Sequence, residues 1–290
     1  MPTDPRPIDH AVIAVHDLDA ARAAFGRLGF TVAPVAHHPF GTANSVIQLG
    51  GTYIELLAVE DAGRIPEAAE GALSFAAFNR DFLAHREGMS MLALQSADAA
   101  ADRAAFAEAD LPTYAPVHFT RLARAPDGND YEVSFSVTFT SDARIHEAGF
   151  FTCQHHDPER FWWPAYQTHA NGAVRIAGAE MVSRDPADYH IFFTYFTGQH
   201  DMRSDSLMVS YDLGPNRLDL LTPVAAKAMY GVTAPADARP RFIALRIATD
   251  DLATTAVKLR GNGVPFVERM GRLIVPPEAA CGVALAFVEV

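Results

Sequence analysis

Apolar, β-branched runs alternate with segments of helical periodicity along this chain. The first run covers residues 8–17 and ends at Asp17, which can cap a helix over residues 18–28. Gly29 ends this helix, because glycine commonly follows the last helical turn. Three further strand-like runs follow, separated by glycine turns, at residues 31–38, 43–49 and 52–59. The segment therefore predicts a βαβββ module.

The same pattern returns further along the chain. Asp251 ends a strand-like run and begins a helix-like one, and its interval to Gly263 equals that from Asp17 to Gly29. Weaker copies follow two other aspartates, Asp98 and Asp185. We therefore predict four βαβββ modules, at residues 8–60, 88–157, 172–222 and 240–290. A generic α+β protein with coincidental spacing is the alternative.

An irregular segment divides the four modules into two pairs. Residues 157–171 are rich in Pro, Trp and His and show no clear period, and strand patterning restarts after them. The sequence therefore predicts an N-terminal domain at residues 1–165, which carries the candidate site, and a C-terminal domain at residues 166–290. The second domain has Asp219 and Glu289 in strands without a partnered histidine, so we expect it to be a degenerate copy that supports the fold or a partner surface.

The composition and charge of the chain narrow its partners. Of 290 residues, 49% are hydrophobic and 20% are charged, which is typical of a globular protein. The net charge of -12 disfavours nucleic acid and anionic lipid as partners. No apolar run approaches the ~20 residues of a membrane helix, no secretory signal is evident, and the cysteines form no Cys-x-x-Cys pair. We expect a cytoplasmic protein with a small-molecule substrate, and leave a homodimer open.

Several short motifs in the first 175 residues or so stand out. They are Ile8-Asp-His-Ala-Val, Asp17-Leu-Asp-Ala-Ala, Leu28-Gly-Phe, Gly41-Thr-Ala-Asn, Tyr53-Ile-Glu-Leu, Cys153-Gln-His-His-Asp-Pro-Glu, Trp162 and His169-Ala-Asn-Gly-Ala. Together they resemble the glyoxalase-like domain family of the vicinal oxygen chelate superfamily. The resemblance implies an α+β fold in which paired modules form two curved mixed sheets, or half-barrels, around a cleft. In this superfamily the cleft often holds a divalent metal, and known activities include lyases, isomerases, ring-cleaving dioxygenases and drug-binding proteins.

His10 and Glu55 are polar residues within apolar strands. A buried glutamate is costly unless a positive group meets it, and a histidine on a neighbouring strand can do so. Imidazole nitrogen and carboxylate oxygen also suit Zn, Fe, Mn or Ni, so both side chains are predicted ligands of one divalent cation. A buried, hydrogen-bonded His–Glu pair without a metal is the alternative.

A third ligand is expected from the end of the second module. The positions that correspond to His10 in the other modules carry no conventional ligand: Met91, Gly178 and Ala244. The last strand of the second module ends in His155 and His156, and only one of them faces the cleft if the strand is regular. We choose His155, with His156 as the alternative, because His155 shares its face with Phe151 and Cys153. Two histidines and one carboxylate with open positions are typical of non-haem Fe(II) and catalytic Zn sites. A turn-capping role for this pair is also left open.

Other residues near these positions are candidates for catalysis and substrate binding. His38 can act as an acid or a base, and Thr42 and Asn44 can bind a substrate oxygen at a tight turn. Gln154 and Trp162 complete the predicted substrate site, Trp162 as part of an aromatic wall. Ordinary turn chemistry and core packing are the alternatives.

These residues favour a metal-dependent enzyme. The divalent ion (Zn, Fe(II), Mn or Ni) acts as a Lewis acid that stabilises an enolate or oxyanion of a small oxygenated substrate, as in a lyase or isomerase. Glu55 or a nearby histidine moves the proton. An Fe(II) ring-cleaving dioxygenase and a metal-free protein that sequesters a small apolar compound are the two alternatives.

Overall fold

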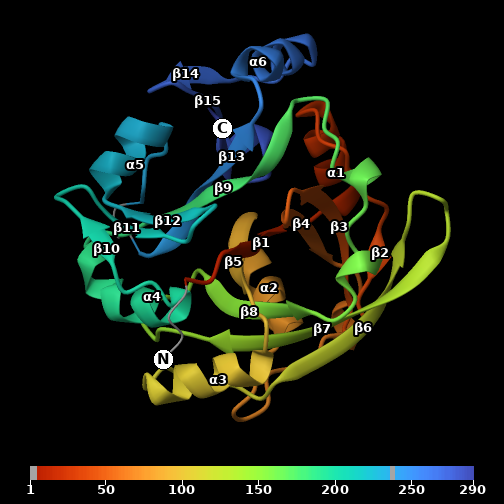
Figure 1. Cartoon of the computed structure of the whole chain (residues 1–290), viewed down its shortest axis with the longest axis vertical. Helices are drawn as coiled ribbons and strands as arrows, with labels where there is room; N and C mark the ends of the chain where they lie inside the picture. Colours follow the sequence, from red (N-terminus) through yellow and green to blue (C-terminus); the bar gives the residue numbers. More distant parts are fainter. Residues whose placement is uncertain (1–4, 236–238) are drawn as a thin grey trace.

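The computed structural model describes residues 5–235 and 239–290, and it contains the four predicted βαβββ modules (Figure 1). Module one consists of β1 (Ile8–Ala14), α1 (Leu18–Arg27), β2 (Ala36–His37), β3 (Thr42–Leu49) and β4 (Thr52–Val59). Module two consists of β5 (Gly88–Gln95), α3 (Ala99–Glu108), β6 (Val117–Arg124), β7 (Asp130–Thr140) and β8 (Gly149–His155). Between them lies α2 (Phe75–Leu83).

The second half of the chain repeats this arrangement. Module three consists of β9 (Ala173–Val182), α4 (His190–Thr197), β10 (Met202–Ser204), β11 (Met208–Asp212) and β12 (Arg217–Leu221). Module four consists of β13 (Arg241–Thr249), α6 (Leu252–Gly261), β14 (Val267–Arg269), β15 (Arg272–Val275) and β16 (Ala284–Glu289). Between them lies α5 (Pro223–Tyr230). Short 3-10 helices are η1 (Ala62–Arg64), η2 (Pro158–Arg160), η3 (Pro164–Tyr166), η4 (Pro186–Tyr189) and η5 (Pro277–Ala279).

Three of the four aspartates that mark the repeat are helix caps. Asp17, Asp98 and Asp251 each accept hydrogen bonds from backbone N–H groups in the first turn of the helix that follows. This satisfies donors that have no partner inside the helix. Asp185 makes no such side-chain bond, and the segment after it begins as a 3-10 helix before α4.

Two strands of the first sheet differ from the prediction for physical reasons. The strand expected over residues 31–38 is reduced to the two residues of β2, because Pro34 cannot donate to a strand ladder. The strand β6 was not predicted at all. In β6, Arg121 points inward while Leu122 is 59% exposed, so the expected alternation of apolar and polar residues is inverted.

The sixteen strands among the described residues form two mixed sheets. The first has the order β2-β3-β4-β1-β5-β8-β7-β6 and the second the order β10-β11-β12-β9-β13-β16-β15-β14. In each sheet the first strands of its two modules pair antiparallel at the centre, and the last strand of each module lies parallel to the first. The predicted α+β fold of paired, curved sheets is therefore confirmed (Figure 1).

The two sheets pack against each other through one shared core. We call the side of the first sheet that carries Ile8, Ala11 and Ile13 its outer face, and the side that carries His10 and Val12 its inner face. The outer face belongs to a hydrophobic cluster that also draws on α1, α3, α4 and the second sheet. The predicted domain boundary at residues 165 and 166 stays a prediction.

The inner faces of the two sheets differ. The segment that leads into α2 covers the inner face of the first sheet and leaves a cavity beneath it. In the second sheet, Ala225, Ala226 and Tyr230 of α5 pack directly on the corresponding face. Within the described part of the chain, no helix is long and apolar enough to cross a membrane.

Candidate metal and substrate site

A cavity of about 150 Å³ lies at the inner face of the first sheet. Its walls come from β1, β3, β4, β6, β7 and β8 and from residues 66–76. Most of the lining side chains are aromatic or aliphatic, and the polar ones include His10, His38, Asn44, Tyr53, Glu55, Ser74 and Arg121. Four of these are linked by close contacts, and we call them the polar wall: His10, His38, Asn44 and Glu55. An apolar hollow with a few convergent polar groups is typical of a small-molecule site.

Glu55 lies at the centre of this polar wall. The side chain is 5% exposed and accepts a hydrogen bond from Asn44 Nδ2 at 2.5 Å. Its Oε2 lies 3.8 Å from Nε2 of His10, and its Oε1 lies 3.8 Å from Nε2 of His38. The carboxylate is therefore placed between two imidazoles, on the side of the sheet that faces the cavity.

Asp9 reaches the same wall through an irregularity in β1. Ile8 pairs with Leu94 and His10 pairs with Ala93, so Asp9 is an extra residue in the ladder. Such a β-bulge breaks the alternation of side chains between the two faces. As a result, Oδ1 of Asp9 lies 2.6 Å from Nδ1 of His10. The sequence prediction missed Asp9 because it assumed strict alternation.

The Asp9 carboxylate fixes the orientation of His10. Burial would raise the pKa of Asp9, but the charge of His155 and hydrogen bonds with His10 and His155 outweigh burial and lower that pKa to about 2. An ionised Asp9 holds a proton on Nδ1 of His10 and leaves Nε2 free to face Glu55. Histidines that bind metals commonly have a carboxylate on the other nitrogen in this way.

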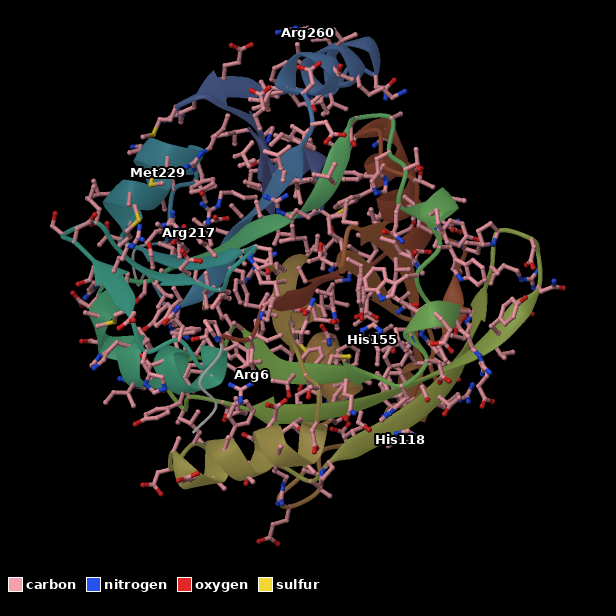
Figure 2. The ribbon with its side chains drawn as sticks, in the orientation of Figure 1. Arg6, His118, His155, Arg217, Met229 and Arg260 are labelled. Carbon is pink, nitrogen blue, oxygen red and sulfur yellow. The ribbon has the colours of Figure 1, made fainter. Side chains whose placement is uncertain are left out.

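His155 lies on the inner face of β8, where it meets Asp9. Its Nε2 is 3.2 Å from Asp9 Oδ1, and its ring stacks on Trp162 with 5.9 Å between centroids. Figure 2 shows His155 among the side chains enclosed by the first sheet. The predicted ligands His10, Glu55 and His155 thus belong to one chain of contacts, in which Asp9 stands between the two histidines.

His156, the alternative ligand, directly follows β8 and is exposed. Its Nε2 lies 2.8 Å from Oγ of Ser136, and its ring centroid lies 5.3 Å from that of His118 on the edge strand β6. The regular alternation along β8 therefore separates the two histidines, as the sequence predicts for a regular strand.

His38 is a buried, neutral imidazole beside Glu55. Its Nδ1 lies 2.9 Å from Oγ1 of Thr42, and Asn44 Nδ2 lies 3.4 Å from its Nε2. Burial lowers the pKa of His38 well below its usual value, and the charges of Arg121 and His37 lower it further. His38 is therefore unprotonated near neutral pH. Thr42 and Asn44 hold His38 and Glu55 in place.

Gln154 and Trp162 lie outside the lining of the cavity. Gln154 accepts a hydrogen bond from the N–H of Ala99 at 3.1 Å and donates one to the carbonyl of Ala97 at 3.0 Å, so it holds the start of α3. Trp162 packs on His155 and on Tyr53. Their predicted contact with a substrate stays a prediction.

Cys153 is a further polar residue of the cavity that the sequence analysis did not select. One ligand atom each of Asp9, His10 and Cys153 lies within 4.8 Å of the others. Burial, together with the negative charges of Asp9 and Glu55, raises the pKa of the Cys153 thiol well above its usual value. These three residues form a second position at which a cation could be held.

The donor set fits a divalent cation. Metal–nitrogen and metal–oxygen bonds to Zn are about 2.0–2.2 Å long. Two atoms that are 3.8 Å apart, such as His10 Nε2 and Glu55 Oε2, can therefore share one ion. The position beside Cys153 depends instead on Asp9, whose carboxylate already contacts Nδ1 of His10. This favours the position between His10 and Glu55.

The second module places apolar residues at the corresponding positions. In the first sheet, Glu55 of β4 pairs with Val12 of β1, which lies two residues after His10. In the second module, Met91 corresponds to His10. Phe151 of β8 corresponds to Glu55, because it pairs with Ala93, two residues after Met91. A cation would therefore be held mainly by module one, and the opposite wall of the cavity is available for an apolar part of a substrate.

Known proteins resemble this chain in sequence pattern and in fold. A family model described as a glyoxalase-like domain matches residues 8–194. A hypothetical protein from Staphylococcus aureus has a TM-score of 0.69 at 14% sequence identity and covers 98% of this chain and 99% of its own. No curated protein sequence matches.

Two further solved structures are similar over the whole chain. A mutant of 4-hydroxymandelate synthase from Streptomyces coelicolor has a TM-score of 0.59 at 10% identity and covers 99% of this chain and 93% of its own. A fusion of a xylose isomerase-like TIM barrel with 4-hydroxyphenylpyruvate dioxygenase has a TM-score of 0.57 at 15% identity and covers 100% of this chain and 50% of its own. At these identities the similarity shows the fold.

Proposed function

Because the chain belongs to the glyoxalase-like domain family of the vicinal oxygen chelate superfamily, we propose that it is a metal-dependent enzyme that acts on a small oxygenated substrate. One observation carries the proposal. The Glu55 carboxylate lies 3.8 Å from a nitrogen of His10 and 3.8 Å from a nitrogen of His38, at the wall of an apolar cavity. In this proposal His10 and Glu55 hold the cation, and His38 handles the proton.

The residues of the polar wall would divide the chemistry among them. A bound divalent ion supplies Lewis acidity, which stabilises negative charge on a substrate oxygen. Asp9 keeps the proton on Nδ1 of His10, and Asn44 holds the Glu55 carboxylate by its amide N–H. His38 is neutral, so it can take a proton from a carbon next to the substrate oxygen and return it elsewhere. This is the proton transfer of a lyase or an isomerase.

An Fe(II) ring-cleaving dioxygenase is the second candidate. Two imidazoles and one carboxylate with open positions are also the ligands of non-haem Fe(II) oxygenases. One of the similar structures contains a 4-hydroxyphenylpyruvate dioxygenase. Oxygen uptake during turnover by the Fe(II)-loaded protein separates the candidates, because a lyase or isomerase consumes none.

The metal content of protein purified without chelators tests the proposal. We expect about one divalent ion per chain in the wild type, and loss of most of it in His10→Ala and Glu55→Gln, because each variant removes one ligand. His156→Ala is the matched control, since this histidine directly follows β8 and is exposed, and it should keep the ion.

Two results would contradict metal dependence. One is equal metal content in the wild type and both site variants. The other is wild-type protein that contains no ion and whose thermal stability is unchanged by added Zn, Mn or Fe(II). The first result would show that His10 and Glu55 do not hold the ion, and the second would favour a metal-free protein that binds a small apolar compound in the same cavity.

A further inference from the structure

Arg121 is a buried cation at the wall of the cavity. The side chain is 8% exposed, and its guanidinium carbon lies 5.7 Å from the ring centroid of Phe135 and 5.9 Å from that of Phe161. Its Nη1 donates a hydrogen bond of 3.3 Å to the carbonyl of Leu122. An arginine stays charged in a protein even when burial lowers its pKa, as it does here.

The positive charge of Arg121 has no carboxylate within 4.0 Å among the residues that the structure describes. The other buried arginines differ in this respect. Arg6 meets Asp102 at 2.9 Å, and Arg246 meets Asp219 at 2.7 Å. A guanidinium offers five N–H donors, and a buried charge without a counter-ion is costly. The guanidinium that lines this cavity is therefore suited to an anion that enters from outside.

The chemistry of the wall points to a single carboxylate as that anion. A planar guanidinium matches the two oxygens of a carboxylate with two parallel hydrogen bonds. One guanidinium balances one negative charge, and Glu55 lines the same cavity, so a single carboxylate fits better than a dianion.

The rest of the cavity selects for a compact apolar group. An apolar cavity of about 150 Å³ is large enough to hold benzene, and this one has that volume. Six phenylalanines belong to its wall: Phe40, Phe75, Phe119, Phe135, Phe139 and Phe151. These faces and edges suit a flat ring.

From this geometry we propose that Arg121 binds the carboxylate of a substrate that carries one ring, or an apolar group of similar size. The inference rests on the proposed function, which assigns the reaction to His10, His38 and Glu55. It adds the class of substrate. With its carboxylate held by Arg121, the remainder of the substrate lies between the aromatic wall and the group formed by His10, His38 and Glu55.

Binding of phenylacetate and of its uncharged analogue phenylacetamide tests this inference. Both probes carry the same ring, and only the first is an anion. We expect calorimetry on the purified full-length protein to show tighter binding of phenylacetate, and we expect Arg121→Met to weaken that binding about 10- to 100-fold. Binding of phenylacetamide should be nearly unchanged by the substitution.

The matched control is Arg124→Met. Arg124 lies on the same strand, is exposed, and pairs with Asp130 at 2.5 Å. This control should keep the preference for the acid. Removing the metal with a chelator should also leave the preference in place, because Arg121 and not the ion is its source.

Three results would overturn the inference. The wild type could bind the acid and the amide equally, or Arg121→Met could bind the acid as tightly as the wild type. The preference could also survive Arg121→Met and disappear after chelation or in His10→Ala. That last result would mean that the metal ion, and not Arg121, binds the substrate carboxylate. The proposed function would then remain valid, so a failure of this inference can be distinguished from a failure of the proposed function.

The thermal stability of the Arg121→Met variant separates a binding role from a structural one. Replacing an unpaired buried charge by an apolar side chain of similar length is expected to leave the melting temperature unchanged or higher. A variant that melts well below the wild type without ligand would contradict the inference. Arg121→Lys then provides a second test, because an ammonium lacks the planar fork, and an undiminished preference for phenylacetate in this variant would also contradict it.

Discussion

At the scale of single residues, the polar wall sets neighbouring groups in different protonation states. Asp9 is ionised, with its pKa lowered to about 2 by His155 and His10 despite its burial. His38 is neutral, because burial lowers its pKa well below the usual value. Acid and base roles in enzymes commonly follow from environments that move pKa values apart. The arrangement gives Asp9 the role of orienting His10 and leaves His38 unprotonated beside Glu55.

The burial of His38 predicts a dependence of stability on pH. An unfolded histidine takes up a proton near pH 6.5, whereas the folded, buried His38 does not. Below that pH the unfolded state binds more protons, so stability falls with falling pH. We expect the free energy of unfolding of the wild type to fall, relative to His38→Gln, by up to about 1.4 kcal/mol per pH unit.

Urea denaturation at several pH values between neutral and mildly acidic measures this difference. His156→Gln is the control, since an exposed imidazole should produce no comparable slope. A stability difference between wild type and His38→Gln that stays constant with pH would show that His38 is not a buried neutral group.

Part of this wall was predictable from the sequence. Glu55 and His10 were identified because polar residues inside apolar strands are costly unless they have a partner. Asp9 was not, because only the pairing of β1 with β5 reveals the bulge. Arg121 was not identified, because its strand was not recognised. In β6 the charged Arg121 is buried and the apolar Leu122 is exposed, which is the reverse of the usual strand pattern.

At the scale of elements, the second sheet carries an ionic cluster where the first sheet has its site. Asp219 of β12 corresponds to Glu55 of β4. Asp219 pairs with Glu180 of β9, whereas Glu55 pairs with Val12 of β1. One arginine, Arg246 of β13, lies 2.5 Å from Glu180 and 2.7 Å from Asp219. The capping aspartates predicted the repeat of these modules, but α5, which covers this cluster, was not predicted.

The burial of Glu180 predicts that its carboxylate destabilises the protein at high pH. Burial raises the pKa of Glu180 to about 7, although the charge of Arg246 opposes this shift. Between about pH 4.5 and 7 the folded state binds more protons than the unfolded state, so stability falls as pH rises. We expect Glu180→Gln to be more stable than the wild type above pH 7, by about 1–3 kcal/mol.

Urea denaturation between mildly acidic and mildly basic pH measures this gain, which should shrink as the pH falls. Asp219 still pairs with Arg246 in the variant, so no charge is left alone. An equal loss of stability at all pH values would mean that Glu180 is ionised and well paired throughout.

At the scale of the whole molecule, the two halves share one core across the outer faces of their sheets. Phe150 of β8 and Phe242 of β13 lie 5.9 Å apart between ring centroids, and both are at most 1% exposed. The sequence predicted two pairs of modules but gave no sign of this contact. A strand pattern indicates which face is apolar, and it does not indicate which other sheet covers that face.

The shared core predicts that damage to the second sheet destabilises the first. Phe242→Ala should cost about 3–5 kcal/mol, as large-to-small substitutions in a core commonly do. Both tryptophans, Trp162 and Trp163, belong to the N-terminal half as predicted from the sequence. We therefore expect tryptophan fluorescence and far-UV circular dichroism to show one coincident transition in urea, shifted equally by the substitution. A fluorescence transition that the substitution leaves in place would show two independent domains.

Anomalous X-ray diffraction from crystals loaded with Mn(II) or Zn(II) tests the central claim most directly, because it locates the ion itself. The account predicts a single strong peak in the cavity, about 2.0–2.3 Å from both Nε2 of His10 and a carboxylate oxygen of Glu55. A peak beside Asp9 and Cys153 that leaves Glu55 without a bond to the ion, or a cavity without any peak while ions bind elsewhere on the protein, would contradict it.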